Sequence, residues 1–155
     1  MIWMYCGKIG SGKSRYAERV TKEHPAVVLS VDELTLPLQD LLAGETHDRV
    51  TDAVKAYVLN VARQAAHAGA DVILDWGFWK KAEREKVRSE LEADGYPVKL
   101  VYFSVSDEKW AANLQDRNRR IREDGYQAYE VDEGLRAKCA ELFEEPSADE
   151  IDIIV

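Results

Sequence analysis

Short apolar runs alternate with longer amphipathic segments along the whole chain. Apolar runs rich in β-branched or aromatic residues predict buried strands, and apolar residues repeated every three or four positions predict helices. The predicted strands cover residues 1–6, 26–30, 71–75, 98–105 and 151–155. The predicted helices cover residues 13–23, 46–68, 80–93, 108–122 and 132–144. This alternation is typical of an α/β fold, in which helices cover both faces of a parallel sheet.

The residues between these segments are turn formers and caps. Gly69 follows the clearest helix, in the position where glycine commonly ends helices, and Ser106 and Asp107 precede the fourth helix as N-terminal caps. The chain has 155 residues and contains no repeat, low-complexity stretch or linker. That length is usual for one domain. Residues 1–155 are therefore expected to form a single domain.

Residues 7–14 read GKIGSGKS and match the phosphate-binding pattern G-x-x-x-x-G-K-[ST] without a mismatch. An apolar strand precedes the motif and an amphipathic helix follows it, as a phosphate-binding loop requires. In such a loop the backbone N–H groups and the helix dipole face phosphate oxygens, the lysine reaches the β- and γ-phosphates, and the serine hydroxyl ligates Mg²⁺. The residues expected to bind the nucleotide are Gly7, Ile9, Gly10, Ser11, Gly12, Lys13, Ser14 and Arg15. A plain strand-to-helix turn with chance glycines is the alternative.

Two carboxylates follow predicted strands, at the edge of a parallel sheet where ligands bind. Asp75 ends the third strand and is expected to hold Mg²⁺ together with Ser14; a strand end without a metal role is the alternative. Asp32 follows the second strand, nineteen residues after Lys13. It is expected to act as the base that accepts a proton from an acceptor hydroxyl. Alternatively, Asp32 caps a helix that begins at Glu33, and Glu33 is itself a weaker candidate for the base.

An arginine-rich stretch covers residues 114–123, and a glycine-containing break follows it at Asp124-Gly125. Such a stretch is often a solvated surface, but its place after the fourth strand is where small kinases carry a mobile lid. The lid is expected to cover approximately residues 117–130. Arg117 and Arg120 share a helix face and are the expected catalytic arginines, and Arg117 is also expected to contact the nucleotide.

Composition and charge indicate which binding partners and which cellular compartment to expect. The net charge of −8 disfavours a large nucleic-acid footprint, because duplex binding depends on a basic face. No apolar stretch reaches the eighteen residues of a membrane span, and the N-terminus lacks the pattern of a signal peptide, so a cytoplasmic protein is expected. Cys6 and Cys139 are expected to be buried thiols.

Taken together, these motifs resemble those of the small bacterial P-loop kinases of the AAA_33 type. This group is related to chloramphenicol phosphotransferase, zeta toxins and the 5′-kinase domain of polynucleotide kinase. The likeness covers nearly the whole chain, and it rests on Gly7–Ser14, Asp32, Asp75–Trp79, Glu83-Arg84, Arg117-Asn118, Phe143–Pro146 and Asp149-Glu150.

The resemblance implies a three-layer P-loop NTPase fold with a five-stranded parallel sheet in the order 2-3-1-4-5 and a helical lid. It also implies ATP with Mg²⁺ as the phosphoryl donor, a hydroxyl acceptor, and Asp32 as the base. The chain departs from its relatives at Asn113, one helical turn before the Arg117-Asn118 pair, where relatives often carry an arginine. The departure leaves open whether Arg117, Arg119 or Arg120 supplies the lid charge.

The leading interpretation is an ATP-dependent kinase that transfers the γ-phosphoryl group to a hydroxyl of a small molecule. A polynucleotide or nucleoside 5′-hydroxyl kinase and a nucleotide-dependent binding or regulatory protein without an acceptor remain alternatives. The aromatic residues Trp76, Phe78 and Trp79 line the acceptor pocket in one interpretation; in the other, Phe78 and Trp79 pack the next helix onto the sheet. Arg49 either reaches an anionic acceptor or faces solvent.

Overall fold

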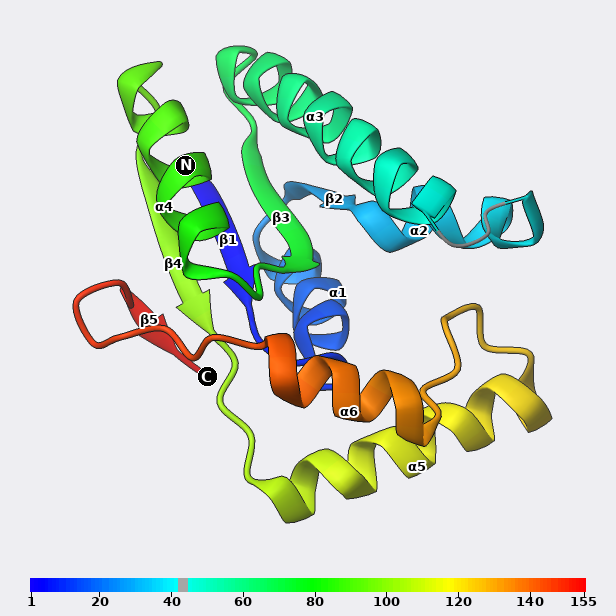
Figure 1. Cartoon of the computed structure of the whole chain (residues 1–155). Helices are drawn as coiled ribbons and strands as arrows, with labels where there is room; N and C mark the ends of the chain where they lie inside the picture. The colour runs from blue at the N-terminus through cyan, green and yellow to red at the C-terminus, as the bar shows by residue number, and fades with distance from the viewer. Residues whose placement is uncertain (42–44) are drawn as a thin grey trace.

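The computed structural model describes residues 1–41 and 45–155 and contains a parallel sheet of five strands (Figure 1). The strand order across the sheet is β2-β3-β1-β4-β5, and each neighbouring pair is parallel. This is the order that the resemblance implies, and it confirms the predicted α/β fold. The strands are β1 (Ile2–Cys6), β2 (Ala26–Ser30), β3 (Asp71–Gly77), β4 (Val98–Tyr102) and β5 (Ile153–Ile154).

Helices cover both faces of this sheet, and Figure 1 shows α4 in front of it and α1 behind it. They connect successive strands, and two further helices lie beyond the C-terminal ends of the strands. The helices are α1 (Lys13–Glu23), α2 (Val31–Thr35), a 3₁₀ helix η1 (Leu36–Leu41), α3 (Glu45–His67), α4 (Lys81–Ala93), α5 (Asp107–Asp124) and α6 (Glu133–Leu142). No helix in the described ranges is both long enough and apolar enough to cross a bilayer.

The core has three clusters. Two of them lie on opposite faces of the sheet, because successive strand residues point to opposite faces. On one face, Met4 and its neighbours pack against residues of α3 and α4 such as Val58 and Leu91. On the other face, Tyr5 and Phe103 pack against Ala17 of α1. The third cluster lies outside the sheet and joins α5, α6 and the glycine-rich turn; its buried members are Trp110, Leu114, Val131 and Cys139. Cys6 and Cys139 are both buried free thiols, as predicted.

Several boundaries differ from the predictions. The fourth strand ends at Tyr102 instead of residue 105, because the chain leaves the sheet there to reach Ser106, the N-terminal cap of α5. The last strand shrinks to two residues, since the Asp152 carboxylate turns back to accept a hydrogen bond from Leu100 N at 2.8 Å. Sequence periodicity also missed α2 and η1, which together span residues 31–41 and are too short to show a repeat.

A buried arginine ties the C-terminal segment to the turn after β3. The Arg84 side chain is 1% exposed, and its Nε donates to a Glu150 carboxylate oxygen at 2.7 Å. Its Nη1 donates to the carbonyls of Phe78 at 3.1 Å and Glu144 at 2.8 Å. Several motif residues that carry the family resemblance therefore form one structural network. Phe78 is fully buried, so the packing interpretation is correct for this residue.

Candidate active site

The glycine-rich turn, residues 7–12, links β1 to α1 and requires glycine at two positions, Gly10 and Gly12. Gly12 has a φ of 102° and Gly10 a φ of 77°, both in the left-handed region that other residues avoid. A Cβ on Gly10 would also lie 2.7 Å from the Leu114 side chain of α5. The turn is thus curled and closely packed against α5, and α1 begins directly after it with its N–H groups free to face an anion.

Lys13 is the first residue of α1 and folds back over the turn. Its ammonium donates hydrogen bonds to the carbonyls of Gly7 at 3.0 Å and Lys8 at 2.9 Å, with Ser11 Oγ at 3.4 Å. Burial lowers the pKa of Lys13, and the carboxylates of Asp75 and Asp32 oppose this shift. The positive charge of Lys13 is therefore held inside the turn and shares its surroundings with both predicted carboxylates.

Ser14 and Asp75 are in direct contact. The Ser14 hydroxyl donates a hydrogen bond of 2.7 Å to Asp75 Oδ2, and the Asp75 side chain is buried at 5% exposure. Mg²⁺ prefers hard oxygen ligands and is usually held by one or two protein oxygens together with water and phosphate oxygens. A hydroxyl and a carboxylate placed side by side next to a phosphate-binding turn fit this ion.

Asp32 lies in the first turn of α2 but does not cap it. The cap is Ser30, whose hydroxyl accepts a hydrogen bond from Glu33 N at 3.4 Å, so the interpretation of Asp32 as a cap is wrong. Among the described residues the Asp32 carboxylate accepts no hydrogen bond. The Asp32 residue is exposed, yet desolvation by the surrounding protein raises its pKa, while the charges of Arg117 and Lys13 lower it. Asp32 is thus a free carboxylate facing two cations.

The arginines of α5 point in different directions. Arg117 is half-buried, and its Nε donates to the Tyr129 carbonyl at 3.0 Å. Burial lowers the pKa of Arg117, whereas Tyr126, Asp32 and Asp75 raise it. Arg119 instead lies on the outer surface, where it pairs with Asp116 at 2.7 Å and with Glu123 at 3.4 Å. Helix geometry therefore brings Arg117 to the carboxylates and directs Arg119 away from them.

Arg120 and Arg122 also make their contacts away from Asp32 and Asp75. The Arg120 guanidinium lies 4.4 Å from the centre of the Tyr126 ring, and Arg122 pairs with Glu130. Arg49, the predicted contact for an anionic acceptor, is exposed at the start of α3. None of these three forms a described contact with Asp32 or Asp75.

Comparison with known proteins identifies the family. The family AAA_33, described as an AAA domain, matches residues 2–146. The chain belongs to the AAA_33 family. A search among curated proteins found no match. The family membership confirms the resemblance drawn from the motifs, and it places the chain among P-loop kinases.

Solved structures support the fold of this AAA_33 chain. Kti12 from Chaetomium thermophilum, in complex with ADP-AlF3, is 18% identical with a TM-score of 0.68; the match covers 100% of this chain and 88% of Kti12. The APS kinase CysC of Mycobacterium tuberculosis, in complex with AMPPNP and APS, is 21% identical with a TM-score of 0.62 over 99% of this chain and 86% of CysC. A gluconokinase from Sinorhizobium meliloti 1021 is 16% identical with a TM-score of 0.62, covering 99% and 80%. At these identities the likeness shows the P-loop NTPase fold.

In this AAA_33 chain a row of side chains on α5 holds the glycine-rich turn. Trp110 Nε1 donates to the Ile9 carbonyl at 2.7 Å, and Asn113 Nδ2 donates to the Gly10 carbonyl at 2.9 Å. One turn further, Asp116 accepts from the Arg15 guanidinium at 2.9 Å. Sequence reasoning missed Trp110 and Asp116, although spacings of three residues place all three on one helix face. Asn113, the departure from the relatives, is thus a contact to the turn.

The segment predicted as a lid divides between two elements: residues 117–124 belong to α5, and residues 125–130 belong to the α5–α6 connection, residues 125–132. Asn118 fixes this connection at Val131 through two hydrogen bonds, of 2.7 Å to the Val131 carbonyl and 2.9 Å from its N–H. The Tyr129 hydroxyl contacts Thr35 Oγ1 of α2 at 2.9 Å. Neither Tyr129 nor Thr35 belongs to the motifs on which the family resemblance rests. The connection therefore links α5 to the helix that carries Asp32.

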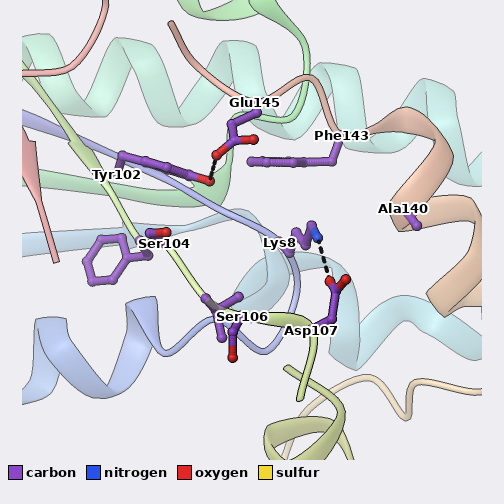
Figure 2. A pocket seen from close by; sticks show the side chains of 10 residues that line it. Lys8, Tyr102, Ser104, Ser106, Asp107, Ala140, Phe143 and Glu145 are labelled. Carbon is purple, nitrogen blue, oxygen red and sulfur yellow. Dashed lines mark hydrogen bonds and ion pairs between the residues drawn. The ribbon is translucent and has the colours of Figure 1, made fainter. Parts of the chain in front are cut away.

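A pocket of about 390 Å³ opens beside the turn at the end of β4 (Figure 2). The Tyr102 hydroxyl donates to Glu145 at 2.7 Å on one side, and Lys8 pairs with Asp107 at 3.7 Å on the other. Burial and the bond to Glu145 raise the pKa of Tyr102 to about 12. Strand order places this pocket across β1 from Asp75, which lies in β3, and from Asp32, which follows β2. The pocket is therefore separate from Asp32 and Asp75, neither of which lines it.

Proposed function

We propose that this protein is a kinase that transfers the γ-phosphoryl group of ATP, bound with Mg²⁺, to a hydroxyl of a small molecule. One observation carries the proposal: Asp32, a carboxylate with no hydrogen-bond partner among the described residues, lies where its charge interacts with Lys13 of the phosphate-binding turn and with Arg117. A switch or a motor needs the turn and the metal site but has no need of a free carboxylate facing two cations.

The residues divide the work of phosphoryl transfer. The N–H groups of the turn and of α1 bind phosphate oxygens, and Lys13 exchanges its bonds to the turn for bonds to the β- and γ-phosphates. Ser14 and Asp75 hold Mg²⁺, which supplies neutralising charge to the phosphate oxygens when bound. Arg117 stabilises the charge that develops on the transferred group.

Asp32 accepts the proton of the acceptor hydroxyl. Desolvation raises the pKa of Asp32, which makes this carboxylate a stronger proton acceptor than one in water, while the charges of Arg117 and Lys13 favour its charged form. The family membership and the names of two solved relatives, a gluconokinase and an APS kinase, support a small acceptor. The protein's net charge of −8 supports the same choice over a polynucleotide.

The test is transfer of the γ-phosphoryl group from radiolabelled ATP, with Mg²⁺, to a panel of hydroxyl-bearing metabolites. For an acceptor found in this way, Asp32→Asn is expected to reduce transfer by about 10²-fold or more while ATP binding persists. The matched control is Glu33→Gln, which changes the neighbouring exposed carboxylate and is expected to retain transfer.

Three results would contradict the proposal. Unchanged transfer in Asp32→Asn would remove Asp32 as the base. Tight ATP binding by the wild-type protein without transfer to any acceptor in a broad panel would favour the nucleotide-dependent binding protein instead. Steeply salt-dependent binding of oligonucleotides would favour the polynucleotide kinase.

A further inference from the structure

Tyr129 contacts both Arg117 and the helix that carries Asp32. Its backbone carbonyl accepts from Arg117 Nε at 3.0 Å, and its hydroxyl lies 2.9 Å from Thr35 Oγ1, although 94 residues separate Tyr129 from Thr35. Thr35 ends α2, three residues after Asp32. In Figure 1 the connection that carries Tyr129 rises from the end of α5 towards α2. One residue thus joins the arginine and the helix of the candidate base.

The direction of the hydrogen bond follows from the surroundings of Thr35. The Thr35 side chain is buried, at 2% exposure, and its hydroxyl donates its only proton to the Val31 carbonyl at 3.2 Å. Thr35 Oγ1 must therefore accept, and the Tyr129 hydroxyl must donate. A phenylalanine at position 129 would remove the bond and leave the ring in place.

The backbone around Tyr129 is held on α5 from two sides. Arg117 holds the Tyr129 carbonyl, and the neighbouring Asn118 holds both polar groups of the Val131 backbone. The His47 ring of α3 meets the Tyr129 ring edge to face, at 6.4 Å between centres. Tyr129 is therefore fixed to α5 through its backbone and to α2 and α3 through its side chain.

We propose that Tyr129 is a positioning residue that couples Arg117 to the helix carrying Asp32 and so holds the two side chains in place during phosphoryl transfer. The proposal rests on the proposed function and deepens it. Since Arg117 and Asp32 act on the transferred group and on the acceptor hydroxyl, a fixed link between their helices aligns both groups at once. With the link in place, bulk water is kept from the γ-phosphoryl group; without it, α5 and α2 move independently.

The test compares Tyr129→Phe, Thr35→Val and the double variant with the wild-type protein by hydrogen–deuterium exchange. Either single variant is expected to speed exchange in both residues 31–41 and residues 125–132, by about 3- to 10-fold, the loss expected for one neutral hydrogen bond. The double variant is expected to match Thr35→Val, because that substitution already removes the bond to Tyr129 together with the bond to the Val31 carbonyl. Tyr57→Phe removes an exposed hydroxyl on α3 and is expected to match the wild type.

Kinetics separate a positioning role from a purely structural one. In Tyr129→Phe, kcat for transfer is expected to fall about 3- to 10-fold with KM for ATP unchanged, and the ratio of acceptor-independent ATP hydrolysis to transfer is expected to rise. A lowered melting temperature with unchanged kcat would reduce Tyr129 to a structural contact and overturn the proposal.

The exchange experiment needs no acceptor, so the two proposals fail in different ways. Faster exchange confined to the segment that carries each substitution, or additive effects in the double variant, would overturn the coupling even in an active kinase. A wild-type protein that binds ATP but transfers nothing would overturn the proposed function, and would do so whatever the exchange pattern.

Discussion

The Ser14 hydroxyl donates a hydrogen bond of 2.7 Å to the buried carboxylate of Asp75. The two residues are 61 positions apart and come from the start of α1 and from β3. This pair predicts that Ser14→Ala weakens ATP binding in the presence of Mg²⁺ by about 10- to 100-fold, as expected when a polar contact to a charged group is lost. Calorimetric titrations with Mg²⁺ and with a chelator would check it.

The control for that experiment is Ser89→Ala, which removes an exposed serine hydroxyl bonded within α4. Its affinity for ATP is expected to equal that of the wild-type protein under both conditions. If Ser14→Ala lost the same affinity with and without Mg²⁺, the hydroxyl would serve the phosphates and not the metal.

A second prediction separates the arginines of α5. Arg117→Ala is expected to reduce phosphoryl transfer by about 10²-fold or more, because a donor aimed at developing charge is lost. Arg119→Ala is expected to change transfer less than twofold, since its ion pairs with Asp116 and Glu123 lie on the exposed surface, away from Asp32 and Asp75. Steady-state rates of both variants decide the matter, and equal losses would show that the surface arginine moves into the site.

A third prediction concerns Asp32 and the stability of the protein. Desolvation raises the pKa of Asp32 in the folded state above its ordinary value of 3.8, so the folded protein binds the proton more tightly than the unfolded chain does. The free energy of unfolding therefore falls as pH rises from 3.8 through the higher pKa of Asp32 in the folded state, and above that range the charged carboxylate destabilises the folded protein. Asp32→Asn is expected to raise the melting temperature at pH 7, and this gain is expected to shrink below about pH 4. Melting curves across pH test this; a loss of stability at pH 7 would contradict the assignment.

A fourth prediction concerns the buried pair of Arg84 and Glu150. The hydrogen bonds from Arg84 lower the pKa of Glu150 from 4.5 to about 2. The stability that this pair provides is therefore present above pH 4.5 and is lost as pH falls towards about 2. Glu150→Gln is expected to flatten the acid limb of the stability curve between these values, as measured by denaturant titration at each pH.

Substitution of the partner should be more severe. Arg84→Ala leaves Glu150 buried without its charge partner and is expected to lower the free energy of unfolding by about 3–5 kcal/mol. Arg88→Ala removes an arginine that pairs with the more exposed Asp152 and is expected to cost about 1 kcal/mol at most. Similar losses in both variants would mean that burial of Arg84 adds nothing.

The sheet and the glycine-rich turn could be predicted from the sequence because both depend on local patterns. Each apolar run marks a strand, although the ends of several strands differ from the ends of the runs, and the spacing from Gly7 to Ser14 is complete within one turn. The helix α2 could not be found in this way. At five residues it shows no periodicity, and Ser30 and Asp32 are equally good caps by residue type. Only the fold shows that Ser30 caps the helix and leaves Asp32 free.

The choice among the arginines and the role of Tyr129 also lay beyond the sequence. Arg117 and Arg120 share a helix face by spacing, so their order of importance depends on how α5 docks against the turn through Trp110 and Asn113. Contacts between residues 94 positions apart, such as Tyr129 with Thr35, leave no local trace. The contact between Ser14 and Asp75 was predictable because Ser14 belongs to the complete motif and Asp75 lies near the end of an apolar run; the link between the helices was not.

The folded-back lysine of the turn has a consequence for anion selectivity. Lys13 Nζ is within bonding distance of three neutral oxygens, the carbonyls of Gly7 and Lys8 and the hydroxyl of Ser11. An anion that binds the turn must offer the ammonium stronger acceptors than these oxygens. A polyphosphate chain reaches more of the turn than sulfate or a lone phosphate does, so we expect the turn to bind longer phosphate chains more tightly than simple anions.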